Sequence, residues 1–231
     1  MSSNLNIVLV HGAWADGSSW NRVIPLLQDN GCRVVAVQIP LTSLAEDVAI
    51  TRHVLALQTG PSVLVGHSYG GAVITEAGTD VPDVVGLVYI SAFAPDEGES
   101  IGDLNARASA SGQAQIRTDD QGLLWISQEG FAGAFAQDLD PDEARILAAV
   151  QKPIAAGVFW DKITKPAWKS KASWSLISEN DRMIPPDTQR FMASRMGATV
   201  LSVRASHASL LSRPNEVVKL ITDAVAKTAS V

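Results

Sequence analysis

The sequence GHSYGG at residues 66–71 decides how this chain folds. The residues before it, VLV at 63–65, are typical of a short buried strand, and those after it, AVITEA at 72–77, are typical of a helix. A serine in this setting sits on a sharp turn, because its flanking glycines lack the Cβ atoms that would collide as strand and helix close on each other. The turn lifts the hydroxyl of Ser68 clear of the sheet and places the N–H of Tyr69 at a helix N-terminus, where a developing negative charge is stabilised. We therefore predict a serine nucleophile; a glycine-rich turn that merely contains a serine is the alternative.

The composition of the chain is that of one globular domain. With 231 residues it is long enough to bury a large core, and its 46% hydrophobic and 18% charged residues are ordinary for a soluble protein. The net charge of −6 argues against nucleic-acid binding, which needs a basic surface. No run of about 18 apolar residues and no leader-like segment stands out, so we expect neither a membrane span nor secretion. We expect a cytoplasmic protein in which the lone Cys32 is structural.

Apolar runs and helical patterns alternate along most of the chain, which is typical of a parallel sheet covered by helices on both faces. Strands are predicted at residues 7–10, 34–37, 63–65, 85–90, 174–177 and 200–203, and core helices at residues 20–28, 44–57, 72–77 and 214–227. We therefore predict an α/β fold with a mostly parallel six-stranded sheet.

The alternation breaks after the fourth predicted strand. Residues 96–171 contain no strand-like run of comparable length. They contain two helical patterns, at 122–138 and 141–151, with Asp140 placed to cap the second. We predict that this segment is a small helical cap inserted into a single domain that covers residues 1–231.

A serine hydroxyl needs a neighbouring base, and the chain contains four histidines that could provide it. His67 is adjacent to the serine on the wrong side of the turn, His53 falls inside an amphipathic helix, and His11 lies in the loop after the first strand. His207 follows the last predicted strand, and in a parallel sheet that loop emerges at the same carboxyl edge as the serine. We predict His207 as the base; a loop histidine without a partner is the alternative.

A carboxylate must orient that base. Asp181 lies in the loop after the predicted strand at 174–177, within SENDRMIPP at residues 178–186, whose two prolines favour a fixed loop. Glu179 in the same loop and the turn at residues 95–97 are competitors. We predict Asp181, because its loop opens at the carboxyl edge of the sheet and the order serine, acid, histidine then follows along the chain.

The first strand ends in HGAW at residues 11–14, at the same edge of the sheet. Gly12 in this loop lets the backbone approach a reacting carbonyl closely. We predict that the N–H groups of Ala13 and Tyr69 together stabilise the oxyanion of an acyl-transfer reaction. A simple strand-exit turn is the alternative interpretation of Gly12.

Together, the serine turn, HGAW and the two loops that carry Asp181 and His207 resemble the α/β-hydrolase superfamily, over essentially the whole chain outside the inserted segment. More narrowly, LVHGAW at residues 9–14, the serine turn, and DRMIPP followed by QRFM at residues 181–192 resemble one branch of it. That branch contains plant methylsalicylate-type esterases, hydroxynitrile lyases and many small bacterial esterases, which do not share one reaction. The resemblance implies an α/β-hydrolase fold with a serine, acid and histidine triad.

Two positions favour an esterase over a lyase within that branch. The best-known plant lyases of the branch carry a threonine where this chain has Gly12, and a lysine where it has Ala208. A lyase needs a positive charge to accept departing cyanide, and Ala208 supplies none. A dehalogenase of this fold needs an aspartate nucleophile, which argues against that activity for a chain with Ser68.

The sequence therefore predicts a serine carboxylesterase that forms an acyl-enzyme with small, uncharged, hydrophobic esters. We expect no metal and no organic cofactor, because the histidines are dispersed and no Cys-x-x-Cys occurs. Substrate contacts are expected from aromatic residues of the edge loops and of the inserted segment: Trp14, Phe93, Trp125, Phe131 and Trp160. A hydroxynitrile lyase, a lactonase and a non-catalytic ligand receptor remain alternatives. The oligomeric state is open, and the cap offers a surface for a homodimer.

Overall fold

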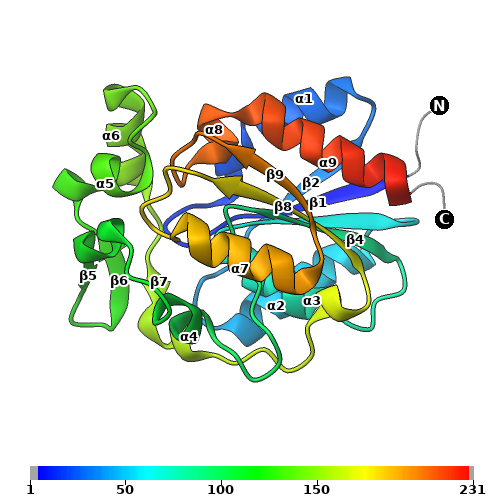
Figure 1. Cartoon of the computed structure of the whole chain (residues 1–231), viewed down its shortest axis with the longest axis horizontal. Helices are drawn as coiled ribbons and strands as arrows, with labels where there is room; N and C mark the ends of the chain where they lie inside the picture. The colour runs from blue at the N-terminus through cyan, green and yellow to red at the C-terminus, as the bar shows by residue number, and fades with distance from the viewer. Residues whose placement is uncertain (1–4, 229–231) are drawn as a thin grey trace.

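A six-stranded parallel sheet forms the centre of the computed structural model, which describes residues 5–228 (Figure 1). The strand order β2-β1-β3-β4-β8-β9 is parallel throughout, so the predicted α/β fold is confirmed. The strands are β1 (Asn6–Val10), β2 (Arg33–Val37), β3 (Ser62–His67), β4 (Val84–Ile90), β8 (Ala172–Ser178) and β9 (Thr199–Val203). The central strands β1, β3 and β4 are buried on both faces, which explains why they are nearly continuous apolar runs without alternation.

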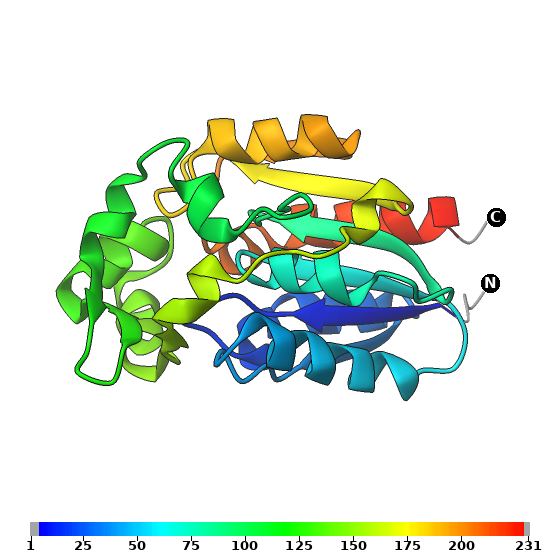
Figure 2. The same cartoon turned by 90° about the horizontal axis from the view of Figure 1, so that it is seen from below.

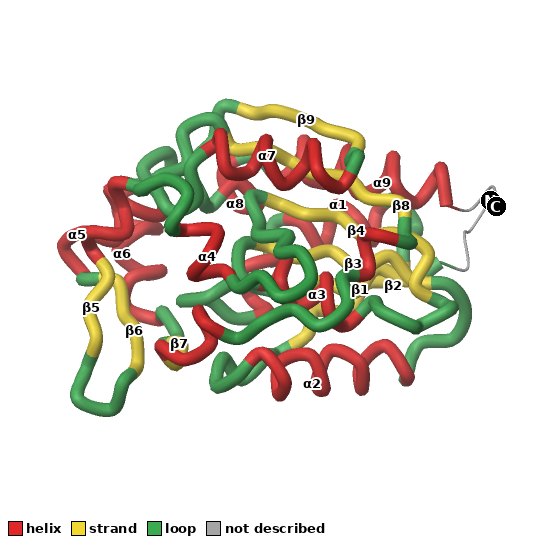
Figure 3. The backbone as a smooth tube through the Cα atoms, turned by 60° about the horizontal axis from the view of Figure 1, so that its bottom comes forward, coloured by secondary structure: helices red, strands yellow, loops and turns green. Residues whose placement is uncertain are grey.

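Helices cover both faces of this sheet. One face carries α1 (Val23–Asp29) and α9 (Pro214–Thr228); the other carries α2 (Leu44–Ala56), α3 (Gly70–Ala77) and α7 (Pro186–Met196) (Figures 1 and 3). Two short helices, η1 (Gly17–Trp20) and α8 (Ser209–Ser212), follow β1 and β9. In the part of the chain that the structure describes, no helix has both the length and the apolar character needed to cross a bilayer.

The insertion between β4 and β8, residues 91–171, stands at the end of the sheet toward which the strands point (Figure 2). It contains a three-stranded antiparallel sheet, β5 (Ile116–Thr118), β6 (Leu123–Ile126) and β7 (Ile154–Ala155). Its helices are α4 (Ile101–Asn105), η2 (Ser111–Gln115), α5 (Gln128–Phe135), α6 (Pro141–Val150), η3 (Ala156–Trp160) and η4 (Ala167–Lys169). The insertion therefore faces the loops that follow β1, β3, β8 and β9.

The small sheet corrects the prediction of a purely helical insertion. The helix predicted at residues 122–138 is wrong over its first part, where β6 forms and α5 begins only at Gln128. Gly122 has a φ of +76°, and the Asp119 carboxylate accepts a hydrogen bond from the N–H of Leu123 at 2.9 Å. These two residues turn the chain back on itself, so that β5 and β6 pair as a hairpin before the helix can start.

Of two helices, α6 and α7, only α6 is predicted from the sequence. Helix α6 lies at its predicted place, because Asp140 accepts a hydrogen bond from the N–H of Asp142 and Pro141 occupies the first helical position. Helix α7 is not among the predicted helices. Its buried face mixes Thr188 and Gln189 with apolar residues, so no continuous apolar stripe marks it.

Candidate active site

Ser68 occupies a strained turn between β3 and α3. Its φ is +53°, in the left-handed region that residues other than glycine rarely adopt. Close backbone contacts require the glycines around it: a Cβ on Gly66 would lie 2.5 Å from the carbonyl oxygen of Gly70, and a Cβ on Gly71 would lie 2.2 Å from that of Phe93. Only this glycine pattern allows the turn, which presents the serine at the carboxyl edge of the sheet.

Three side chains from three loops form one chain of hydrogen bonds. His207, which follows β9, has its Nε2 2.8 Å from the Oγ of Ser68 and its Nδ1 2.8 Å from the Oδ2 of Asp181, which follows β8. Because a carboxylate oxygen only accepts, Nδ1 carries the hydrogen and Nε2 is left to accept the proton of the hydroxyl. The imidazole and carboxylate side chains are completely buried, and the serine is 4% exposed. The structure thus brings together the three residues that the sequence analysis selects as nucleophile, base and acid.

Asp181 is surrounded by donors. Its Oδ1 accepts hydrogen bonds from the N–H groups of Met183 and Ile184, and its Oδ2 accepts from the Nε2 of Gln189 at 2.9 Å in addition to His207. Four donors compensate the charge of a buried carboxylate. The role of Gln189 is missed by the sequence analysis, where its only signal is the QRFM motif.

The two competing acidic positions lie elsewhere. The carboxylate of Glu179 pairs with the guanidinium of Arg190, and that of Asp96 pairs with the ammonium of Lys169 at 2.7 Å. Both ion pairs have substantial exposure to solvent. Each of these acids therefore has a partner at the surface, away from the buried imidazole.

His67 contacts His207 rather than Ser68. Its Nε2 donates a hydrogen bond to the carbonyl oxygen of His207 at 2.9 Å, and the centres of the two rings are 4.9 Å apart. Complete burial lowers the pKa of His67 to about 3, so its ring stays neutral at physiological pH. The sequence analysis misses this contact because it joins residues 140 positions apart in the chain. The exposed His53 lies on α2, as predicted.

The residues around the base are also tied to the insertion. The N–H of Ser206 donates to Oδ2 of Asp138 at 2.8 Å, and the N–H of Ala208 donates to the carbonyl oxygen of Phe135 at 3.1 Å. The ring of Phe135 packs edge-on against that of His207, with the ring centres 4.8 Å apart. The backbone on either side of His207 is thus held by the end of α5 and the turn that follows it.

The loop after β1 lies directly against Ser68. A Cβ on Gly12 would lie 2.7 Å from the Cβ of Ser68, so a larger residue there would displace one or the other. The N–H groups of Ala13 and Tyr69 have no hydrogen-bond acceptor among residues 5–228, and both residues line the same small cavity as the serine. Unpartnered amides beside a nucleophile are what an oxyanion requires. The Nδ1 of His11 donates a hydrogen bond to the Gly12 carbonyl, which holds the loop in place. Burial lowers the pKa of His11 to about 4, so its ring is neutral at physiological pH.

A buried carboxylate fixes Tyr69. The phenol hydroxyl donates a hydrogen bond to Oδ2 of Asp47 at 2.6 Å, and Oδ1 of Asp47 accepts one from the N–H of Leu41. Burial raises the pKa of the Asp47 carboxyl and raises that of the Tyr69 phenol well above its usual value. The sequence analysis misses Asp47, because an acidic residue in the first turn of a helix is ordinary.

Two cavities lie at this edge of the sheet. The smaller one, of about 20 Å³, is lined by Ser68, by the polar side chains Asn105 and Gln113, and by apolar side chains that include Phe93. The larger one, of about 320 Å³, is lined by the aromatic side chains Phe131 and Phe135 of α5. Trp14 lines both. Of the expected substrate contacts, the structure thus brings Trp14, Phe93 and Phe131 to the cavities.

The structure brings neither of the other two expected substrate contacts, Trp125 and Trp160, to these cavities, which corrects the prediction for both residues. The indole of Trp125 donates a hydrogen bond to the carboxylate of Asp119 at 2.8 Å, within the hairpin that the sequence analysis interprets as a helix. Trp160 lies at the end of η3 with 66% of its surface exposed. Neither residue lines either of the two cavities.

A parallel sheet with a serine on a left-handed turn after β3, an acid after β8 and a histidine after β9 has the architecture of the α/β hydrolases. The model of the alpha/beta hydrolase family matches residues 7–220. The chain belongs to the alpha/beta hydrolase family.

Similar proteins include named esterases. The carbendazim hydrolyzing esterase of Nocardioides sp. (strain SG-4G) is 35% identical over 109 residues, which are 42% of this chain and less than half, 45%, of that protein. Methylesterase 2 of Arabidopsis thaliana is 26% identical over 85% of this chain and 86% of that protein, which confirms the resemblance to the plant esterase branch. A pyrethroid hydrolase from Sphingobium faniae JZ-2 has the same fold, with a TM-score of 0.85 and 24% identity over 98% of this chain and 100% of that one.

Proposed function

We propose that this protein is a serine carboxylesterase that hydrolyses small, uncharged, hydrophobic esters. The observation that carries the proposal is the unbroken chain of hydrogen bonds from Ser68 through His207 to Asp181, beside two amides without acceptors. The printed names of the relatives, an esterase, a methylesterase and a pyrethroid hydrolase, agree with this class of reaction.

The reaction proceeds through an acyl-enzyme. Nε2 of His207 takes the hydroxyl proton as the Oγ of Ser68 attacks the ester carbonyl, and Asp181 stabilises the imidazolium that forms. The N–H groups of Ala13 and Tyr69 donate to the oxyanion, and the loss of one such donor costs on the order of 10²–10³ in rate. The alcohol leaves with the proton from His207, and a water molecule then repeats the sequence to release the acid.

The charges around the two cavities favour an ester over a cyanohydrin. No lysine or arginine lines either cavity within residues 5–228, so neither departing cyanide nor a substrate carboxylate meets a cation there. Ala208, next to the base, is buried and neutral. Gly12 leaves room for an acyl carbonyl near the serine, since even a Cβ at this position would collide with Ser68.

Hydrolysis of p-nitrophenyl acetate and butyrate tests the proposal. We expect the parent protein to release p-nitrophenol and Ser68→Ala to lose nearly all of this activity. Ser202→Ala, on the exposed face of β9, is the matched control and should retain it. Equal, feeble rates from the parent and Ser68→Ala would overturn the proposal, as would release of aldehyde and cyanide from mandelonitrile as the faster reaction.

A further inference from the structure

The cavity that contains Ser68 is too small for an ester. Its volume of about 20 Å³ accommodates roughly one water molecule, whereas sites for small organic ligands usually measure about 300–1,000 Å³. Space for a substrate must therefore come from a neighbouring region of the molecule. The cavity of about 320 Å³ beside it has the required size.

The larger cavity is lined mostly by apolar side chains, with polar residues on one side. Its inner wall consists of side chains from α5, α6 and α8, among them Phe131, Phe135, Leu147, Leu210 and Leu211. Ile146 and Val150 lie at its edge, each with 61% of its surface exposed. On the side of η1 the lining is polar and includes Asp16, Ser18 and Asn21. Such a cavity suits an uncharged ligand with an apolar body.

Trp14 is the wall between the two cavities. Among the described residues it is the one that lines both. Its ring lies 6.3 Å from that of Phe159, which lines the smaller cavity, and its Nε1 donates a hydrogen bond to the carbonyl oxygen of Leu124 on β6 at 2.9 Å. Its φ is +59°, a backbone conformation that a residue with a side chain adopts only when its surroundings hold it there. One hydrogen bond to the insertion therefore helps to keep the partition closed.

The larger cavity lies on the side of the base. Two of its lining residues, His67 and Phe135, have ring centres 4.9 Å and 4.8 Å from that of His207. In ester hydrolysis the base returns its proton to the leaving oxygen, so the alcohol part of the substrate is the part next to the imidazole. The acyl part then remains on the side of the smaller cavity.

We propose that Trp14 is a movable partition whose displacement joins the two cavities, and that the larger cavity accepts the apolar alcohol part of the ester. This inference rests on the proposed esterase function and narrows its substrates to esters of bulky, apolar, uncharged alcohols. Trp14 acts here as a specificity-determining residue. It forms no part of the hydrogen-bonded chain that carries the chemistry.

Two isomeric esters test the proposal, because they differ only in which side of the ester carries the phenyl group. In 2-phenylethyl acetate it lies on the alcohol side, and in methyl 3-phenylpropanoate it lies on the acyl side. We expect Trp14→Ala to raise the ratio of their kcat/KM values about tenfold in favour of 2-phenylethyl acetate. Leu147→Trp, which fills the larger cavity, should lower the same ratio about tenfold. The ratio cancels any general effect of a substitution on Ser68 or His207.

Trp160→Ala is the matched control, because it removes an indole that lines neither cavity and should leave the ratio unchanged. A ratio that stays constant in Trp14→Ala and Leu147→Trp would overturn the partition. A ratio that moves toward methyl 3-phenylpropanoate in Trp14→Ala would overturn the assignment of the alcohol side.

Binding of 2-phenylethanol to Ser68→Ala, measured by calorimetry, separates this inference from the esterase proposal. We expect binding that weakens at least tenfold when Leu147→Trp is added and tightens when Trp14→Ala is added. If no ester is hydrolysed but this pattern is observed, the esterase proposal fails and the ligand cavity stands. If esters are hydrolysed but Leu147→Trp leaves the binding of 2-phenylethanol unchanged, the cavity assignment fails alone.

Discussion

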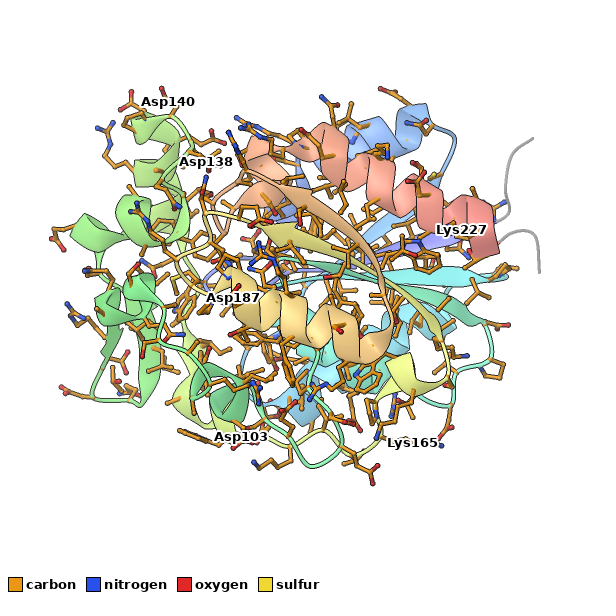
Figure 4. All side chains as sticks on the ribbon, in the orientation of Figure 1. Asp103, Asp138, Asp140, Lys165, Asp187 and Lys227 are labelled. Atoms are coloured by element: carbon orange, nitrogen blue, oxygen red, sulfur yellow. The ribbon has the colours of Figure 1, made fainter. Side chains whose placement is uncertain are left out.

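The carboxyl edge of the sheet and the insertion above it are held together in different ways. At the edge, backbone lies against backbone: a Cβ on Gly70 would lie 2.5 Å from the carbonyl oxygen of Val10. In the insertion, side chains make several of the joints, alongside backbone hydrogen bonds such as that from Ala208 to Phe135. The Gln151 amide bonds to both the N–H and the carbonyl of Ile126, and Asp138, labelled in Figure 4, bonds to the loop of the base. The difference predicts that substitutions in the close backbone packing around Ser68 have larger effects than substitutions in the insertion.

The largest effect that this comparison predicts is on turnover at the rigid edge. Asp181→Asn removes the acceptor that fixes the tautomer of His207, and we expect kcat for p-nitrophenyl acetate to fall about 10⁴-fold. Glu179→Gln, in the same loop but paired with Arg190 at the surface, is the matched control and should retain most of the activity. Similar losses in both variants would contradict the assignment of the acid.

The pH dependence of stability should also come from the edge of the sheet. Burial lowers the pKa of His67 to about 3 and that of His11 to about 4, against an ordinary value near 6.5. Between these values the unfolded chain binds protons that the folded chain does not, so stability falls as pH falls. From pH 7.5 to 5.0 we expect each histidine to contribute a loss of about 2 kcal/mol in the free energy of unfolding.

Urea unfolding of the parent protein and of His67→Gln at the two pH values measures this contribution. The loss on acidification should be about 2 kcal/mol smaller in the variant, because one of the two imidazoles with a lowered pKa is absent. An equal loss in both proteins would show that His67 titrates normally in the folded state.

Two glycine substitutions compare the regions directly. Gly71→Ala places a Cβ 2.2 Å from the carbonyl oxygen of Phe93, and we expect it to lower the free energy of unfolding by about 3 kcal/mol or to prevent folding. Gly133→Ala, on the exposed face of α5, meets nothing within 4 Å and should stabilise the protein by about 0.5–1 kcal/mol. Thermal unfolding of both variants measures the two changes in stability. Comparable destabilisation by both substitutions would contradict the difference between the two regions.

A small effect is also expected at one helix end of the insertion. Asp140→Ala removes the acceptor for the N–H of Asp142 at the start of α6 and should lower the free energy of unfolding by about 1 kcal/mol. Activity toward p-nitrophenyl acetate should be retained. A fall in kcat for this substrate without a fall in stability would mean that α6 is coupled to the reacting groups more tightly than its side-chain joints suggest.

The features that could be predicted from the sequence are those that a short stretch of residues or a regular pattern determines. The serine turn is visible within residues 66–71, because the glycines that mark it in the sequence are those whose Cβ atoms would collide with neighbouring backbone. The strands of the core are visible because burial on both faces makes them apolar throughout. The loops of Asp181 and His207 could be selected because parallel strands bring their carboxyl ends to one edge.

The remaining parts depend on contacts that the local sequence pattern does not show. The hydrogen bond from His67 to the carbonyl of His207, and that from Gln189 to Asp181, leave no spacing or composition signal. The hairpin of β5 and β6 was missed because its four-residue strand is short and apolar, and a helix explains such a run equally well. With the hairpin unseen, the hydrogen bond from Trp125 to Asp119 could not be predicted either.

The hydrogen bonds on either side of His207 have a consequence for oversized substrates. The N–H groups of Ser206 and Ala208 both donate to the insertion, at Asp138 and Phe135, so an ester that pushes α5 outward also shifts the imidazole away from Ser68. Such an ester would occupy the protein without being cleaved. We expect the bulkiest esters to behave as inhibitors rather than as poor substrates, with tight binding accompanied by a low kcat.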